Sequence, residues 1–233
     1  MAKIYTFGSS WAAGIELKKE HADLTFTHWI GKHYDLEYKN YSIAGACLGL
    51  ILNTLVSNHH KITSEDKVIA MVPPDGRILN EGYEEGFYTV STYQLKLYEQ
   101  LLADKTLEWF RYHHAIQIYT IQKILDDIGC EYLMAHTYGN LKEYKKYSLP
   151  INYDKFLSAD WSLTQLLNGK TKDFNNYPSH LEQGIMYGVE DADGPNEKQS
   201  AEIFTGIYFE GCENHPNLLG HKKIAEMMIQ KLG

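Results

Sequence analysis

The sequence lacks an excess of basic residues. It has 22 lysines and arginines against 30 aspartates and glutamates, a formal net charge of −8. Proteins that bind nucleic acid usually present a basic face. The longest basic stretch, "LKEYKK" at 141–146, is short. We therefore expect no nucleic-acid partner.

Long apolar runs are also missing. No segment approaches the roughly 20 apolar residues that a membrane-spanning helix needs, so no membrane partner is expected. The amino-terminal "KIYTF" leads into a glycine turn without the charged-then-apolar pattern of a secretory signal. These features predict a cytoplasmic or virion-associated protein without a signal peptide.

Cysteine is scarce, and the histidine doublets have no metal-binding spacing. The three cysteines, Cys47, Cys130 and Cys212, are an odd number without paired spacing. They indicate reduced, buried thiols better than a disulfide framework or a metal site. Adjacent histidines, as in 59–60 and 113–114, point about 100° apart on a helix and rarely share an ion. We expect no metal and no cofactor.

What the sequence does contain is an alternation of strand and helix patterns. Compact apolar runs predict strands, and periodic runs predict helices. The expected strands are 3–7, 36–43, 67–72 and 130–138, and the expected helices are 48–59, one or two within 87–128, 161–167 and 217–232. This order implies one α/β domain over residues 1–233, with a parallel sheet between two helical layers.

Three turns of that sheet carry polar residues that could act together. Ser9 and Ser10 follow the first strand, Gly45 closes the turn after the second, and His215 precedes the last helix. In parallel sheets, ligands bind outside the carboxyl ends of the strands. A serine hydroxyl becomes a nucleophile when a histidine takes its proton and when donors face the oxyanion that forms.

Each of these residues also has a purely structural interpretation. Ser9 or Ser10 can cap a helix, Gly45 can serve only a tight turn, and His215 can be an ordinary loop residue. His221 is expected on the exposed start of the last helix.

The turns resemble the sequence blocks of the SGNH, or GDSL-type, hydrolase superfamily. "FGSSWAAG" is similar to the first block, with Ser10 at the serine position and Ser9 in place of the usual aspartate. "NYSIAG" resembles the second block, which ends here at Gly45, and "HPNLLGHKKIAE" resembles the last, which begins at His215.

The resemblance implies a three-layer α/β/α sandwich with a parallel, flavodoxin-like sheet. It also implies hydrolysis of esters, commonly acetyl groups on carbohydrates or short acyl esters, without a metal. Ser10 is then the nucleophile and His215 the base, while the N–H groups of Ser10 and Gly45 hold the oxyanion.

The third block and the triad acid depart from the family pattern. The loop "PPDGR" lacks the usual asparagine, so Arg77 is the candidate third oxyanion donor and Asp75 could orient it. In having an arginine in this loop, the sequence resembles phage-encoded members of the superfamily. Cys212 occupies the place of the triad aspartate. The histidine could then be held by Glu213, by a more remote acid such as Asp75 or Glu210, or by a backbone carbonyl.

The substrate is less readable than the chemistry. Trp11, Asp75 and Tyr83 are the candidate substrate-binding residues. The 18 tyrosines suit either a sugar-binding groove or ordinary strand and rim positions. The departures keep two alternatives to a hydrolase open. One is a binding or structural module, for example in a virion, that has the SGNH fold but weak or no activity. The other is an acyl transferase that uses the same serine. The oligomeric state is open.

Overall fold

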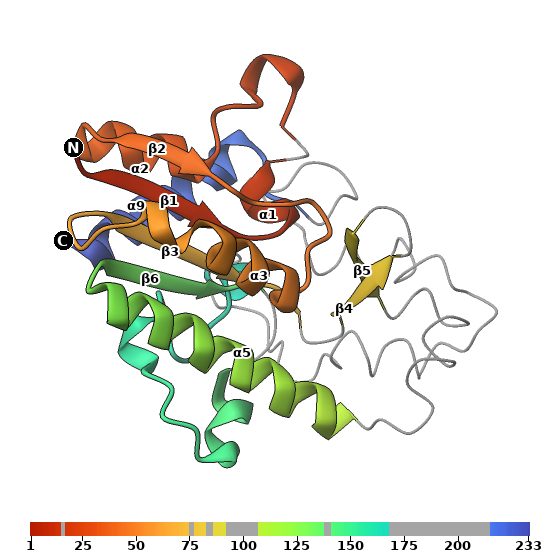
Figure 1. Ribbon diagram of the computed structural model, residues 1–233. Coiled ribbons are helices and arrows are strands. Elements are labelled where there is room, and N and C mark those ends of the chain that lie inside the picture. Colours follow the sequence, from red (N-terminus) through yellow and green to blue (C-terminus); the bar gives the residue numbers. More distant parts are fainter. Residues whose placement is uncertain (15–16, 75–76, 83–85, 92–106, 138–140, 168–214) are drawn as a thin grey trace.

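The computed structural model describes residues 1–14, 17–74, 77–82, 86–91, 107–137, 141–167 and 215–233 (Figure 1). Within them the main sheet has four strands in the order β2-β1-β3-β6, and every neighbouring pair is parallel. These strands are β1 (Lys3–Phe7), β2 (Glu37–Asn40), β3 (Lys67–Val72) and β6 (Glu131–His136). The expected strands are confirmed, and β2 is shorter than its pattern predicted. A parallel bridge from Met134 to Phe156 continues the sheet beyond β6.

Helices cover both faces of the sheet. In Figure 1, α3 and α5 lie on one face, while α2 and α9 lie on the other. The α-helices are α1 (Ser10–Ala13), α2 (Phe26–Tyr34), α3 (Leu48–Asn58), α5 (Leu107–Ile128), α6 (Leu163–Leu167) and α9 (Leu218–Leu232). Short 3-10 turns are η1 (Lys19–His21), η2 (His59–Lys61), η3 (Leu141–Tyr147) and η4 (Tyr153–Lys155). This arrangement is the three-layer α/β/α sandwich expected from the sequence.

Alternate residues of the strands supply two separate cores, because successive side chains point to opposite faces of a sheet. One core joins the sheet to α3 and α5 and includes Tyr5, Val68, Met134, Ile51, Ile118 and Leu125. The other joins the sheet to α2, α6 and α9 and includes Ile4, Ile69, Leu133, Phe26, Leu163 and Ile224.

The helix expected within 87–128 is confirmed as α5, but the start of that range is not helical. Gly86–Ser91 is strand β5, paired antiparallel with β4 (Arg77–Gly82). Only Leu107–Ile128 of that range is described as helix, and it ends before Gly129, as expected. The run "GFYTVS" is rich in aromatic and β-branched residues that favour strands, and this local preference decides the structure there.

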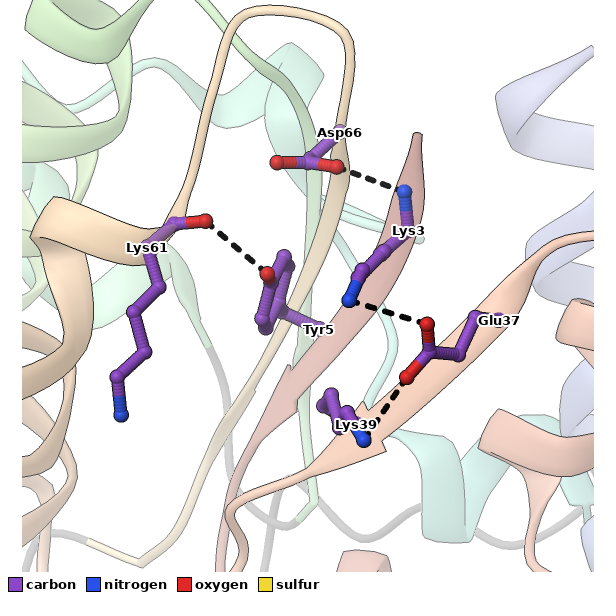
Figure 2. Close-up of polar contacts among 6 residues, drawn as sticks. All are labelled: Lys3, Tyr5, Glu37, Lys39, Lys61 and Asp66. Atoms are coloured by element: carbon purple, nitrogen blue, oxygen red, sulfur yellow. Dashed lines mark hydrogen bonds and ion pairs between the residues drawn. The ribbon is translucent and has the colours of Figure 1, made fainter. Parts of the chain in front are cut away.

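At the amino-terminal end of the sheet, polar groups tie the strands together (Figure 2). The buried Asp66 carboxylate accepts hydrogen bonds from the Lys3 N–H at 2.7 Å and from the N–H and hydroxyl of Thr63. Glu37 pairs with Lys39 at 2.8 Å and with Lys3 at 3.0 Å. The hydrogen bonds from Lys39 and then Lys3 lower the pKa of Glu37 to about 2.

Among the described residues, no helix has the length and apolar character to cross a membrane.

Candidate active site

Ser10 lies where β1 turns into α1, at the carboxyl-terminal end of the sheet. It is the first residue of α1, and Ser9 occupies the N-cap position without a capping bond from its side chain. Gly14 ends the helix in the left-handed conformation, at φ +70°, and donates its N–H to the Ser10 carbonyl. The turn therefore holds Ser10 at a fixed place, and helix capping does not account for the second serine.

Gly8 permits this turn to pack against the neighbouring strand. A Cβ atom on Gly8 would lie 2.7 Å from the Cβ of Ala12 and 2.9 Å from the Cβ of Met71. Both distances are shorter than real side chains tolerate, and both atoms are close to the backbone. The glycine two residues before Ser10 thus sets how closely α1 approaches β3.

The loop after β2 lies directly beside the serine turn. The N–H of Ile43 donates to the carbonyl of Gly8 at 3.0 Å, which extends the β1–β2 pairing into the loop. The Asn40 amide donates to the Ala12 carbonyl of α1 at 2.7 Å, and its oxygen accepts from the Ser42 N–H. Asn40 therefore fastens the loop to the helix that starts at Ser10.

Gly45 occupies the one position in this loop that requires a glycine. The Ala46 N–H bonds to the Ile43 carbonyl, which closes a turn with Gly45 at φ +75°. Type II turns need a positive φ at this position. Space does not impose the glycine, because a Cβ there would meet nothing within 4 Å.

His215 reaches Ser10 from the opposite end of the chain. Its Nε2 atom lies 2.7 Å from the Ser10 hydroxyl oxygen, although the residues are 205 positions apart. Asn217 caps α9 by accepting the Gly220 N–H at 2.9 Å, so the helix starts at Leu218, three residues after the histidine. Ser10 itself is almost fully buried, with 5% of its surface exposed to solvent. A serine hydroxyl held on an imidazole nitrogen at this distance can transfer its proton to it.

The other candidate site residues have different outcomes. Trp11 is a correction, because it is 1% exposed and packs in the core between the sheet and α9 rather than facing a substrate. Arg77 is the first residue of β4, which follows Pro73 and Pro74. Asp75, Tyr83 and Glu213 lie outside the described residues, as do Glu210 and Cys212. The roles of Arg77 and of the five residues outside the described ranges stay predictions.

His221 is a second correction. Expected at the exposed start of α9, it is instead 1% exposed, and its Nδ1 atom accepts the Phe26 N–H at 3.2 Å. Burial, and then the nearby charge of His215, lower the pKa of His221 to about 3. Ile224, Ala225 and Met228 are also buried. Their spacing of three, four and seven residues from His221 is the signal that places this histidine on the inner face of the helix.

Two further histidines are buried on the other face of the sheet. His114 of α5 and His136 at the end of β6 lie with ring centroids 6.2 Å apart, and the Tyr144 hydroxyl lies 3.0 Å from Nδ1 of His114. Burial lowers the pKa of each histidine to about 3. Both rings are therefore neutral at physiological pH.

No described cluster resembles a metal site. The part of the chain that the structure describes contains no group of three His, Cys, Asp or Glu residues that could hold an ion. Cys47 and Cys130 are both buried, and burial raises the pKa of the Cys130 thiol to about 11. A thiol with such a pKa is unreactive at neutral pH.

Comparison with known proteins finds similar structures but no similar sequences. No family model and no curated protein sequence matches the chain. A carbohydrate esterase, whose active site displays divergent catalytic and non-catalytic binding functions, is 12% identical with a TM-score of 0.50. That match covers 99% of this chain but only 64% of the esterase.

Two other solved structures match over nearly their whole length. TesA is 11% identical with a TM-score of 0.49, covering 99% of this chain and 97% of TesA. A G-D-S-L family protein from Desulfitobacterium hafniense is 13% identical with a TM-score of 0.49, and 99% of each chain is covered. At such identities the likeness to the carbohydrate esterase shows the fold alone, and the expected α/β fold class is confirmed.

Proposed function

We propose that the protein is a serine ester hydrolase of the SGNH type, with Ser10 as nucleophile and His215 as general base. The observation that carries this proposal is the 2.7 Å distance between the Ser10 hydroxyl oxygen and His215 Nε2. Three separate observations support the proposal. The chain shares its fold with a solved carbohydrate esterase. Its motifs at Ser10, Gly45 and His215 resemble the family's sequence blocks, and these residues lie at one end of the sheet.

In the proposed reaction, the Ser10 oxygen attacks the carbonyl carbon of an ester as its proton passes to His215 Nε2. The tetrahedral intermediate collapses when His215 returns that proton to the leaving alcohol, which breaks the ester bond and leaves an acyl-serine. A water molecule then attacks the acyl carbon as one of its protons passes to His215. When the second tetrahedral intermediate collapses, His215 returns that proton to the Ser10 oxygen, which breaks the acyl-serine bond and releases the acid. For this cycle His215 must begin neutral, with its own proton on Nδ1.

The oxyanion would be held by backbone donors. The N–H groups of Ser10 and Gly45 are the proposed pair, and Arg77 is the proposed third donor in place of the missing asparagine. One such donor contributes about 3 kcal/mol to transition-state stabilisation in a well-studied hydrolase.

Glu213 is the proposed partner of His215 Nδ1, since Cys212 occupies the position of the usual aspartate.

We further propose a short acyl group, such as acetyl, on a carbohydrate as the substrate. Ser10 is 5% exposed, so little of the hydroxyl is open to a bulky acyl chain. A solved protein with this fold is a carbohydrate esterase. Asp75 and Tyr83 are the proposed contacts to the alcohol part of the substrate.

Turnover of acetyl esters tests the function. We expect release of acetate from p-nitrophenyl acetate and from acetylated sugars by the unaltered protein, and loss of that release in both Ser10→Ala and His215→Ala. His60→Ala, on the exposed turn η2, is a matched control that should keep full activity. Activity that survives Ser10→Ala would refute the assignment.

A binding module is the second candidate, favoured by Cys212 at the acid position and by Ser9 in place of aspartate. It predicts saturable binding of acetylated glycans without acetate release. Equilibrium binding to a glycan panel, measured alongside turnover, separates the two functions. Acyl transfer to an added alcohol in preference to water would instead indicate a transferase.

A further inference from the structure

The first turn of α2 contacts the elements that carry both proposed catalytic residues. Three consecutive residues, Thr25, Phe26 and Thr27, take part. On the serine side, the buried Thr27 hydroxyl donates to the Thr6 hydroxyl of β1 at 2.9 Å. The Thr25 methyl group lies so near the end of α1 that a Cβ on Gly14 would be 2.7 Å from it.

On the histidine side, the same turn is held by His221. Thr25 is the N-cap of α2, but its side chain makes no capping bond, which leaves the first N–H groups of the helix in need of partners. His221 Nδ1 accepts the Phe26 N–H at 3.2 Å, and the two rings stack with centroids 5.9 Å apart. A side chain from α9 therefore caps α2.

We infer that His221 is a positioning residue, which holds the start of α9, and with it His215, at hydrogen-bonding distance from Ser10. This inference rests on the proposed function. The route is continuous. Ser10 is fixed by β1 and α1, which contact α2, and α2 is capped by His221. That histidine belongs to α9, which begins three residues after His215.

The buried neutral imidazole suits this role better than a charged group would. A protonated ring would present a donor at Nδ1 to the Phe26 N–H, and it would place a positive charge near His215. Burial opposes both by keeping His221 neutral. A displacement of about 1 Å between reacting groups can lower a rate about 100-fold, so a bond remote from the chemistry can control turnover.

Two substitutions at His221 separate the hydrogen bond from the packing. His221→Phe keeps a ring on Phe26 but removes the acceptor, whereas His221→Asn places an amide oxygen close to the position of Nδ1. We expect His221→Phe to lower kcat for p-nitrophenyl acetate by about 10- to 100-fold with little change in KM. His221→Asn should restore kcat to within about threefold of the unaltered protein.

Matched controls distinguish positioning from loss of stability. Lys222→Ala removes another α9–α2 contact, the ammonium group 4.7 Å from the Trp29 ring, and should leave kcat unchanged. His114→Phe removes a buried histidine from the opposite core, so it should lower the midpoint of thermal unfolding without lowering kcat at a temperature where the protein is folded.

The ring-nitrogen chemical shifts of His215 provide a readout that does not need turnover. If Ser10→Ala leaves them unchanged, the Ser10–His215 bond does not exist, and the proposed function fails. If Ser10→Ala changes them, His221→Phe should change them in the same direction, and His221→Asn should not. Shifts and kcat that His221→Phe leaves at their original values would overturn the positioning role while leaving the proposed function intact.

Discussion

At the amino-terminal end of the sheet, charged groups pair with one another and with the backbone, as Asp66 does with Lys3 and Glu37 with Lys39 (Figure 2). At the carboxyl-terminal end, the described polar contacts bring a hydroxyl onto an imidazole across 205 residues and leave an exposed turn at Gly45. Lys3 links the first arrangement across strands, because its side chain pairs with Glu37 of β2 and its N–H bonds to Asp66 beside β3. The second arrangement is the geometry that the proposed proton transfer needs. Substitutions at the two ends should therefore affect different quantities, which are stability at the first and turnover at the second.

The largest expected effect is at Ser10. Ser10→Ala should lower kcat/KM for acetyl esters by about 10⁴-fold or more, because it removes the proposed nucleophile, which would act as a unit with His215. The free energy of unfolding should stay within about 1 kcal/mol, since one hydrogen bond is lost. Ester kinetics and urea unfolding on the same sample measure both. A large loss of stability would mean that Ser10 serves the fold.

Acid should weaken the fold through three buried histidines. His114, His136 and His221 have pKa values of about 3 in the folded protein, lowered by burial, against about 6.5 for an unfolded chain. The unfolded state then binds more protons, so stability is full above about pH 6.5 and falls as pH decreases toward 3.

If all three histidines contribute, the slope approaches about 4 kcal/mol per pH unit within that window. Urea unfolding at a series of pH values measures it, and His114→Phe should reduce the slope by about a third. A stability that is constant between pH 6 and 4 would contradict the neutral, buried state of these rings.

Asp66→Ala tests the amino-terminal end. It leaves the N–H groups of Lys3 and Thr63 without their carboxylate partner, so unfolding should become easier by about 3 kcal/mol. The rate of acetyl ester hydrolysis by the folded fraction should not change. Thermal unfolding and kcat provide the test, and a loss of kcat without a loss of stability would show that the two ends are coupled.

Gly45→Ala tests the turn beside Ser10. A non-glycine residue in the left-handed region costs about 1 kcal/mol, because the backbone there has φ +75°. If Gly45 N–H holds the oxyanion, a displaced turn should also lower kcat about tenfold or more. Ser42→Ala in the same loop is the control for general disturbance. Equal effects of both variants on kcat would argue against a specific role for Gly45.

The smallest effect is expected at Glu37. Although its pKa is lowered to about 2, the carboxylate is exposed, and water and salt screen surface ion pairs so that they add little to stability. Glu37→Gln should therefore leave both the urea-unfolding midpoint and turnover essentially unchanged. A loss of stability as large as that of Asp66→Ala would show that the difference in exposure between the two carboxylates does not determine their contributions to stability.

Sequence patterns predicted the elements whose limits are chemically sharp. The run Lys67–Val72 is apolar and stops at two prolines, and it forms β3 with those bounds. The helix expected over 217–232 forms as α9, and the Asn217 side chain caps its start. The order of Ser10, Gly45 and His215 along the chain was readable, but only three-dimensional packing could supply the distance between Ser10 and His215.

The failures have physical causes as well. Phe87–Ser91 fits a strand by residue type, but the lack of Gly and Pro over a longer range hid that preference. Trp11 follows Ser10 and suggested a substrate contact, yet successive residues of a helix face different directions, and this one turns into the core. His221 needed the phase of α9 to be counted from Ile224 and Met228, which are buried on the same face.

Labelling with a fluorophosphonate probe, followed by peptide mapping, tests the central claim most directly. Such probes react with serines that a neighbouring base activates. We predict a label on Ser10 that is lost in His215→Ala and kept in His60→Ala. A folded protein that carries no label on Ser10, or that keeps it in His215→Ala, would contradict a working Ser10–His215 pair.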